Sequence, residues 1–288
     1  MLWKKKGLIF KNSGLTGWRN NSALQPTPLV MEDKIRFYVG FRDEKGVSRV
    51  GYVDIDKDDP TKVIGISESP VLDIGLEGAF DEFGVVPSSI IRVDDLIYMY
   101  YAGYQLGKKV RFLVLSGLAI SKDGGETFER FSNVPVFERT DKEILFRVPH
   151  SVIREKGVFR FWYDVRYLES SDGKDIPKAG TNLIKLKNGE YRIGRPFVFK
   201  ANQKYYMFYG YSTEDRPYKL GYAESLDGIS WERKDEFIGI NLSLEGWDSE
   251  MMAYPCVLNI QGKWFLFYNG NNYGADGFGY AELVSFDD

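Results

Sequence analysis

The sequence holds 288 residues, with 41 acidic and 38 basic side chains and a formal net charge of −3. This balance argues against an electrostatic nucleic-acid binder, because such a protein needs a strongly basic face. One cysteine and one histidine exclude an internal disulfide, a cysteine-rich metal cluster and a two-histidine zinc motif. We therefore expect no metal and no cofactor.

Apolar runs are short throughout the chain. No stretch of about 18 apolar residues occurs, so the sequence predicts no membrane span and no membrane partner. After the basic residues 4–6, only the short apolar segment 8–10 precedes Lys11, which is too little for a signal-peptide core. We expect a cytoplasmic protein, and the sequence carries no signal for its oligomeric state.

Five short runs rich in aromatic and β-branched residues recur along the chain. Each is followed by a polar or glycine-containing stretch, which is typical of β-strands. In chain order the runs are Ile35–Gly40, Leu96–Gly103, Val158–Asp164, Lys204–Gly210 and Lys263–Gly270. The apolar segments that precede them begin at Pro28, Pro87, Pro149, Pro196 and Pro255. The unit recurs about every 58 residues, and no long stretch has the 3.6-residue period of a helix.

A third and a fourth strand are predicted in most of these units. The third strands are placed at Arg49–Ile55, Ser116–Ser121, Thr181–Leu186, Lys219–Ser225 and Phe278–Leu283, with the weakest signal in the third unit. The fourth strands are expected near residues 63–66, 127–131 and 231–233, and in the third unit near residues 191–193 or earlier. Five repeats of four short antiparallel strands predict an all-β, five-bladed β-propeller that forms a single domain over residues 1–288. The last unit has three strands, so we expect the N-terminal segment Gly7–Lys11 to supply its outer strand and close the ring.

Two turns between predicted strands support the repeat. Residues 121–128 (SKDGGETF) fit the Asp-box pattern S-x-D-x-G-x-T-[WF], and residues 225–231 (SLDGISW) are a looser copy. The aspartate of such a turn accepts backbone hydrogen bonds, and its glycine takes a positive φ. We expect these aspartates to hold hairpins together and to do no chemistry.

The predicted fold brings ten short segments to one mouth of the central channel. In a four-stranded meander the first strand starts at the end where the second strand finishes. Residues just before the proline-led strands therefore share a face with residues just after the aromatic strands. A packed core would not tolerate a polar set at these positions unpaired, which makes it the candidate site. The residues expected to bind substrate are Gln25, Arg42, Tyr104, Arg147, His150, Arg166, Arg192, Arg195, Tyr211, Tyr254, Asn269 and Asn271.

Carboxyl groups at the same mouth are the candidate catalytic residues. Glu82 and Glu250 both stand five residues before the repeat proline, in blades that are not neighbours. Glycoside cleavage needs such a pair, one to protonate the leaving oxygen and one to attack or to activate water. The further candidates are Asp81, Asp164 and Asp248. Two alternatives stay open, namely a substrate-binding role and a structural network in which the two glutamates pair with Arg147 and Arg195.

The arginines at the mouth suggest an anionic ligand. A guanidinium forms two parallel hydrogen bonds with a carboxylate or a phosphate, so an acidic, phosphorylated or nucleotide-linked sugar, or free phosphate, would fit. Neutralisation of the local acids is the alternative. Tyr104 and Tyr254 offer flat faces and hydroxyls to a sugar ring. We interpret His150 as a core or substrate hydrogen-bonding residue rather than as a general base, and Cys256 as buried and inert.

The repeats resemble the five-bladed propeller superfamily of glycoside hydrolases, which includes families 32, 43, 62, 68, 117 and 130. The resemblance covers nearly the whole chain and rests on the segments Phe80–Ile91, Arg192–Phe199, Lys219–Asp235 and Gly246–Asn259. In particular, the sequence is similar to uncharacterised propeller proteins often encoded with bacterial surface-polysaccharide genes. The resemblance implies a sugar substrate.

The sequence departs from the patterns of individual families. Family 43 enzymes place an Asp before the proline of blade one, an Asp after the proline of blade two and a Glu near the proline of blade three. This chain has Gln25 or Thr27, Ser88 and Arg147 there, so the family 43 triad does not carry over. Family 130 phosphorylases use arginines for phosphate and a single carboxyl acid, which suits the arginine-rich mouth better, although their blade motifs are not intact here.

Together the residues and the resemblance favour a carbohydrate-active enzyme, most simply a glycoside hydrolase for an acidic or surface-polysaccharide-derived sugar. One alternative is a non-catalytic sugar-binding or assembly protein of polysaccharide synthesis, which the missing triad favours. Another is a glycoside phosphorylase or glycosyl-transferring enzyme. All three have a saccharide as their partner, and none needs nucleic acid.

Overall fold

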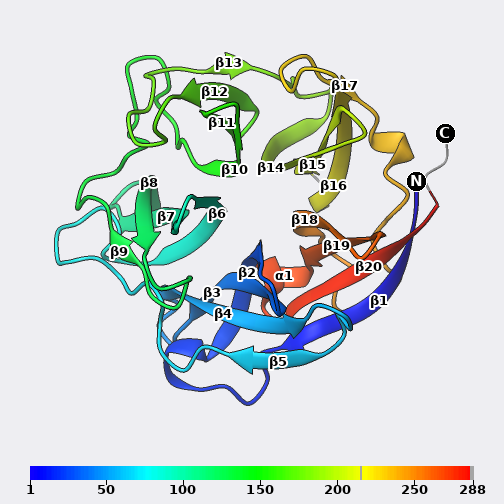
Figure 1. Cartoon of the computed structure of the whole chain (residues 1–288), viewed down its shortest axis with the longest axis horizontal. Helices are drawn as coiled ribbons and strands as arrows, with labels where there is room; N and C mark the ends of the chain where they lie inside the picture. The colour runs from blue at the N-terminus through cyan, green and yellow to red at the C-terminus, as the bar shows by residue number, and fades with distance from the viewer. Residues whose placement is uncertain (215, 286–288) are drawn as a thin grey trace.

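Five antiparallel sheets, each of four strands, are arranged in a ring (Figure 1). The computed structural model describes residues 1–214 and 216–285, and twenty strands lie within them. The predicted five-bladed β-propeller is therefore confirmed. Because each aromatic run is the second strand of its sheet, the run is covered by strands on both sides and is buried.

The strands follow one another blade by blade along the chain. The first blade comprises β2 (Asn21–Val30), β3 (Lys34–Arg42), β4 (Ser48–Asp56) and β5 (Val63–Ile66). The second comprises β6 (Val85–Val93), β7 (Leu96–Leu106), β8 (Phe112–Ser121) and β9 (Glu129–Arg130). The third comprises β10 (Pro149–Glu155), β11 (Val158–Tyr163), β12 (Arg166–Ser170) and β13 (Thr181–Asn182). The fourth comprises β14 (Glu190–Ala201), β15 (Lys204–Thr213), β16 (Arg216–Ser225) and β17 (Glu232–Arg233). The fifth comprises β18 (Ala253–Ile260), β19 (Lys263–Asn269), β20 (Gly277–Ser285) and β1 (Leu2–Lys11).

Among the residues that the structure describes, helical structure is confined to three single turns. Two are 3-10 turns, η1 (Gly17–Arg19) and η2 (Asp235–Phe237), and the third is α1 (Asn271–Gly274). In the part of the chain that the structure describes, no helix is long and apolar enough to cross a membrane.

The N-terminal strand closes the ring, as the sequence predicts. β1 runs antiparallel to β20, with Trp3 opposite Leu283 (blue and red strands in Figure 1). It begins at Leu2 and so is longer than the segment expected from the sequence. Trp3 is buried and packs edge-on against Phe208 of the fourth blade, with 6.0 Å between the ring centroids. The first residues thus join the fifth blade to the fourth.

Aromatic rings fill the spaces between neighbouring blades. Phe37 of the first blade lies 4.7 Å from Phe267 of the fifth, and Tyr100 of the second lies 5.2 Å from Phe161 of the third, measured between ring centroids. All four side chains are fully buried. Burial of one such ring stabilises a fold by about 1.5–3 kcal/mol, so these contacts between blades explain the high aromatic content of the chain.

Two sequence assignments were wrong in detail, and a third holds only in its wider form. The third strand of the third blade is β12, and residues 181–186 contain only the short fourth strand β13. Residues 191–193 belong to β14, the inner strand of the next blade, so the fourth strand of the third blade lies at the earlier position that the sequence left open. The proline of the first blade that matches the others is Pro26 rather than Pro28, because the pairing of β2 shifts register between Leu24 and Thr27, around that proline.

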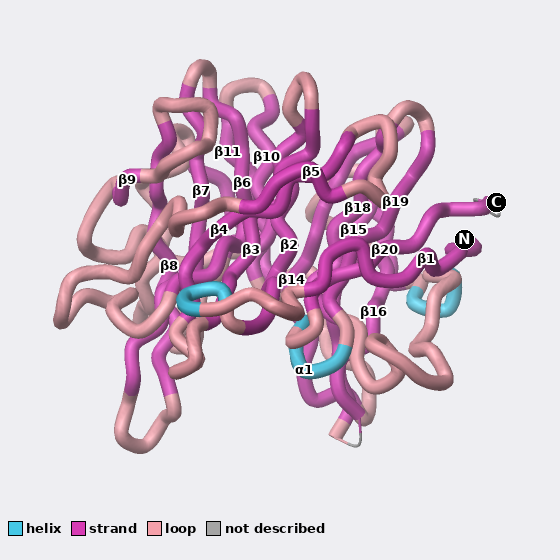
Figure 2. The backbone as a smooth tube through the Cα atoms, turned by 90° about the horizontal axis from the view of Figure 1, so that it is seen from below, coloured by secondary structure: helices cyan, strands magenta, loops and turns pink. Residues whose placement is uncertain are grey.

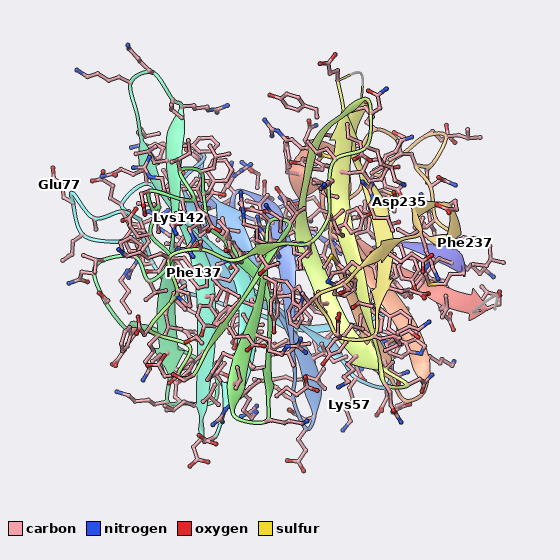
Figure 3. The ribbon with its side chains drawn as sticks, turned by 90° about the horizontal axis from the view of Figure 1, so that it is seen from above. Lys57, Glu77, Phe137, Lys142, Asp235 and Phe237 are labelled. Atoms are coloured by element: carbon pink, nitrogen blue, oxygen red, sulfur yellow. The ribbon has the colours of Figure 1, made fainter. Side chains whose placement is uncertain are left out.

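The inner strands β2, β6, β10, β14 and β18 all begin at the same end of the ring, which we call the mouth face. The hairpins β7–β8 and β15–β16 project from this face (Figures 2 and 3). Lys57, which follows β4, lies at the opposite end (Figure 3). The predicted convergence of the ten segments follows from this arrangement.

Candidate functional site

A bulge beside the proline shapes the start of every inner strand. In three blades the residue before the proline has a positive φ, namely Gln25 (55°), Arg195 (57°) and Tyr254 (55°). This backbone conformation is uncommon for residues other than glycine and costs ~1–3 kcal/mol, so it persists only where the surrounding structure enforces it. The bulges turn three polar side chains toward one another from different blades.

Arg195 lies at the centre of this group, which we call the central cluster: Gln25, Thr27, His150, Arg195 and Tyr254. One Arg195 Nη donates a hydrogen bond to Gln25 Oε1 and lies 3.0 Å from His150 Nδ1. The other Nη lies 3.5 Å from Thr27 Oγ1, and the guanidinium carbon is 5.5 Å from the centroid of the Tyr254 ring. Four of the five blades therefore contribute to a single set of contacts.

Arg195 has no carboxylate partner among the described residues. The residue is half-buried, and burial lowers the pKa of the guanidinium to about 10. An arginine in this setting is ordinarily paired with an acid, because an unpaired buried charge is costly. A cation held by neutral groups alone provides a binding position for an anion.

His150 is neutral in this environment. Burial, together with the adjacent Arg195 charge, holds the pKa of the imidazole well below its ordinary value. Because an arginine nitrogen can only donate, His150 Nδ1 accepts the hydrogen bond and the ring proton sits on Nε2. His150 therefore offers a second hydrogen-bond donor beside Arg195.

Aromatic residues flank the central cluster. Tyr104 packs edge-on against Phe112, with ring centroids 5.4 Å apart, and burial raises the pKa of its hydroxyl against the opposing charges of Arg42 and Arg195. Tyr254 lies 6.2 Å from Tyr273 of α1, measured between ring centroids. Both tyrosines remain protonated at neutral pH and can stack on or hydrogen-bond to a sugar ring.

Two asparagines predicted to bind substrate are engaged with the backbone. Asn269 Oδ1 accepts a hydrogen bond from the Gln25 amide at 2.8 Å, and its Nδ2 donates to the Ala23 and Gly277 carbonyls. Asn271 Oδ1 accepts from the amides of Glu250 and Met251. These contacts indicate that Asn269 positions the Gln25 bulge and that Asn271 shapes the loop before β18.

Asp164 is the carboxyl at the mouth whose acidity is most altered. It follows β11, has a positive φ of 46° and lies 3.9 Å from Arg166 Nη1. Burial raises the pKa of Asp164 to about 7, although Arg166 opposes this shift. A carboxyl group with this pKa is partly protonated at neutral pH and can act as a general acid.

Asp81 and Asp248 are buried and already paired. Asp81 accepts hydrogen bonds from the Tyr101 hydroxyl at 2.9 Å and from Arg130 Nε at 2.8 Å. Asp248 accepts from the Tyr268 hydroxyl at 2.8 Å and from Lys5 at 2.6 Å. Each carboxylate therefore joins an aromatic second strand to an outer segment, which favours a structural role.

The described residues show no contact that joins Glu82 or Glu250 to the central cluster. Glu82 is half-buried and accepts a hydrogen bond from the Gly78 amide at 2.7 Å, within its own turn. Glu250 is exposed. The alternative expectation that they pair with arginines was wrong, because Arg147 pairs with Glu143 at 2.6 Å and Arg195 has no acid partner in the described part of the chain.

The remaining predicted residues surround the mouth without touching the central cluster. Arg147 is buried and also donates to two backbone carbonyls, and Arg166 lies 3.5 Å from Glu143. Arg192 is exposed and lies 5.1 Å from the ring of Tyr191, and Tyr211 lines a small pocket of about 60 Å³ between the fourth and fifth blades. Arg42, at the end of β3, is half-buried, and its charge acts to lower the pKa of the Tyr104 hydroxyl.

Known proteins resemble the chain in both sequence and structure. No family model matches it. The uncharacterized protein Rv1502 of Mycobacterium tuberculosis strain H37Rv is 33% identical over 300 aligned residues, which cover 98% of this chain and 99% of that protein. The chain belongs to the Rv1502 family.

Solved structures place the Rv1502 family among five-bladed propellers. A thermostable family-43 glycoside hydrolase matches with a TM-score of 0.70 and 17% identity, covering 97% of this chain and 94% of that one. A β-1,2-mannobiose phosphorylase from Listeria innocua, in complex with β-1,2-mannobiose, matches with a TM-score of 0.72 and 13% identity, covering 98% and 97%. At these identities the likeness establishes the fold, and the predicted resemblance to propeller glycoside hydrolases is confirmed at that level.

Sequence reasoning missed Glu143 in this Rv1502-family chain. This buried carboxylate accepts hydrogen bonds from the Tyr163 hydroxyl, from the Gly180 amide and from Arg147. It stands six residues before the repeat proline, whereas Glu82 and Glu250 stand five residues before theirs. A search for an acid that matches Asp81 and Asp248, which also meet a tyrosine of the second strand, would have found it.

Proposed function

We propose that the mouth face binds a saccharide that carries an anionic group, and that the protein is a carbohydrate-active enzyme of the glycoside hydrolase type. The observation that carries the proposal is Arg195, a half-buried cation that contacts only neutral side chains of the central cluster and has no carboxylate partner among the described residues. A carboxylate or phosphate on the sugar would supply the missing counter-charge. Structural neighbours named as a glycoside hydrolase and a mannobiose phosphorylase support the carbohydrate class.

Each part of the site has a task in this proposal. Arg195 and the Nε2–H of His150 bind the anionic group, and Tyr104 and Tyr254 contact the sugar ring. Asp164 donates a proton to the leaving oxygen, since its pKa is raised to about 7 by burial. We keep the cytoplasmic location expected from the sequence as part of the same proposal.

The second carboxyl of the reaction is assigned to Glu82 or Glu250. Neither side chain pairs with a cation among the described residues, whereas Asp81 and Asp248 each hold one. A carboxylate without an ion pair has oxygen atoms available to attack the sugar or to activate water. Replacing the correct glutamate by glutamine lowers kcat by orders of magnitude, and replacing the other leaves it near the wild-type value.

The first experiment is a screen of saccharide pairs that differ only in charge, such as a hexoside against its uronate and its phosphorylated form. Arg195→Gln is expected to weaken binding of the charged member about 10- to 100-fold, as loss of a charged hydrogen bond does, and to change the neutral member little. Arg154→Gln is the matched control, because Arg154 is an exposed arginine on β10 toward the opposite end of the blade. Equal binding of both members by the wild-type protein would refute the anionic part of the proposal.

A second candidate function is saccharide binding without turnover. It is favoured by the observation that no carboxylate contacts the central cluster within residues 1–214 and 216–285. A saccharide that binds and is recovered unchanged after long incubation, with and without inorganic phosphate, would establish this function. Turnover that depends on phosphate would identify a phosphorylase instead.

A further inference from the structure

Two neighbouring segments expose apolar side chains on the mouth face. One is the tip of the β7–β8 hairpin, where Val110 is 59% exposed and Leu106 and Phe112 are also exposed. The other is the loop before β10, where the consecutive residues Ile144 and Leu145 are 72% and 64% exposed and Phe146 follows them. Three consecutive exposed apolar residues are uncommon on a soluble surface and indicate an interaction site.

The two segments belong to one continuous surface, which we call the mouth rim (residues 106–112 and 144–146). Val148, directly after the loop, packs with Ala102 and Val114 of the hairpin strands and with Tyr104. The base of the hairpin and the end of the loop are therefore in contact. Tyr104 is also close enough to Arg195 for the arginine charge to act on its hydroxyl group. The mouth rim therefore borders the candidate site.

Unpaired cations accompany the apolar side chains of the hairpin. Lys108, Lys109 and Arg111 are exposed, and none forms an ion pair among the described residues. None of residues 105–112 is acidic. The tip thus presents three positive charges interleaved with exposed apolar groups, on the hairpin that projects from the mouth face (Figure 2).

We propose that the mouth rim docks on an anionic lipid surface. Apolar side chains at a projecting tip enter the boundary between headgroups and acyl chains, while lysine and arginine beside them meet the anionic headgroups. A protein partner fits these observations less well, because lysine is depleted from protein–protein interfaces and a projecting hairpin is convex rather than flat. The proposal departs from the sequence expectation of no membrane partner, which rested on the absence of a spanning segment.

Docking through the mouth rim would turn the candidate site toward the lipid. If the proposed function holds, the saccharide would then be one that is presented at a membrane surface, such as a lipid-linked sugar with an acidic or phosphate group. This last step rests on the proposed function, whereas the docking surface does not. The test below uses vesicles without saccharide, so its outcome is independent of the sugar site.

The experiment is co-sedimentation of the full chain with vesicles of phosphatidylcholine alone and of an equimolar mixture with phosphatidylglycerol. We expect binding to the mixed vesicles only, and weaker binding at about 1 M salt than at about 0.1 M, because salt screens the headgroup charges. Each cation near an anionic surface contributes about fivefold to partitioning, which corresponds to ~1 kcal/mol. The double variant Lys108→Gln/Lys109→Gln is therefore expected to bind about 25-fold less.

Variants of exposed residues separate this docking from non-specific adhesion. The variants Val110→Ser and Leu145→Ser are expected to weaken binding at both salt concentrations, because they remove apolar groups rather than charge. The controls are Leu226→Ser and Lys156→Gln, two exposed residues that line one pocket at the opposite end of the third and fourth blades. Thermal melts show that each variant stays folded.

Two results would overturn the proposal. The first is a wild-type chain that stays in the supernatant with both kinds of vesicle, as expected if the mouth rim serves a protein partner. The second is an equal loss of binding in the mouth-rim variants and in the controls, which would mean that the chain adheres to the vesicle without using the mouth rim.

Discussion

Arg195 shows how a single backbone bulge can direct a charged side chain toward residues of other blades. Its positive φ and the following proline turn the guanidinium toward Gln25 and His150 of other blades. The same bulge in the first and fifth blades presents Gln25 and Tyr254. The ~1–3 kcal/mol that such a conformation costs is offset by the surrounding structure, which includes the hydrogen bond from the Gln25 amide to Asn269. Strain repeated at equivalent positions is therefore part of how the mouth is built.

At the residue scale the first prediction concerns Asp164 and pH. A general acid must be protonated, so kcat is expected to fall as the pH rises through about 7, the pKa to which burial raises this carboxyl. Asp164→Asn is expected to lower kcat by about 10²- to 10⁴-fold and to abolish the alkaline limb of the pH profile. Measurement of kcat against pH for both proteins checks this. An unchanged profile in the variant would assign the limb to another group.

The same carboxyl gives a prediction for stability. The folded protein binds the Asp164 proton more tightly than the unfolded chain, so between about pH 4 and about pH 7 stability falls as the pH rises. Each pKa unit corresponds to ~1.4 kcal/mol, and Asp164→Asn removes this dependence. We therefore subtract the urea midpoint of the wild type from that of the variant. This difference is expected to be larger at pH 8 than at pH 4. A constant difference across this range would contradict the raised pKa.

At the element scale the Asp-box turns hold hairpins, as the sequence predicts for Asp123 and Asp227. Asp123 Oδ1 accepts hydrogen bonds from the Glu126 and Thr127 amides, both at 3.1 Å. Although burial acts to raise it, the hydrogen bonds from Thr127 and Ser121 hold the pKa of Asp123 below its usual value. The charged carboxylate is thus the form that the turn requires.

Asp123→Ala is expected to destabilise the protein by ~1–2 kcal/mol at neutral pH, because several hydrogen bonds to a charged acceptor are lost at an exposed turn. Since the pKa is lowered in the folded state, this contribution is present at neutral pH and lost as the pH falls below about 4. Urea unfolding of the wild type and the variant at neutral pH and below about pH 4 measures how much stability the variant loses at each pH. Asp33→Ala, an exposed aspartate before β3, is the control and is expected to have no effect.

Elements were predictable where the repeat itself is strong. The aromatic side chains of the second strands fill the spaces between blades, so composition alone identified these strands. The prolines identified the inner strands. The third strand of the third blade, Arg166–Ser170, escaped because it is short and starts with a charged residue, while residues 181–186 carry a stronger apolar pattern without forming a third strand. Side-chain pairing was the hardest to predict. Glu82, for example, accepts a hydrogen bond from the Gly78 amide of its own turn instead of pairing with an arginine. Equal spacing from a proline therefore predicted neither the partners of the glutamates nor their distance from the central cluster.

At the scale of the whole molecule, closure of the ring depends on a segment that is distant in sequence from the blade it completes. Asp248 accepts hydrogen bonds from Lys5 of β1 and from the Tyr268 hydroxyl of β19, and its side chain is 2% exposed. Asp81 and Glu143 meet Tyr101 and Tyr163 in the same way in the second and third blades. A buried acid bonded to the tyrosine of the second strand is thus a recurring feature of the fold, and in the fifth blade its cation comes from the N-terminus.

This arrangement separates a structural role of Asp248 from a catalytic one. Asp248→Asn leaves the partly exposed Lys5 without its counter-charge and is expected to destabilise the protein by ~1–3 kcal/mol, the usual cost of losing a charged hydrogen bond. Trp3→Ala, which removes the packing of β1 on the fourth blade, is expected to cost ~3–5 kcal/mol. If Asp248 acts only in closure, both variants lose stability in urea unfolding and keep kcat at temperatures where they remain folded. A stable Asp248→Asn variant with kcat lowered by orders of magnitude would instead place this carboxyl in the reaction, beside the Asp164 acid.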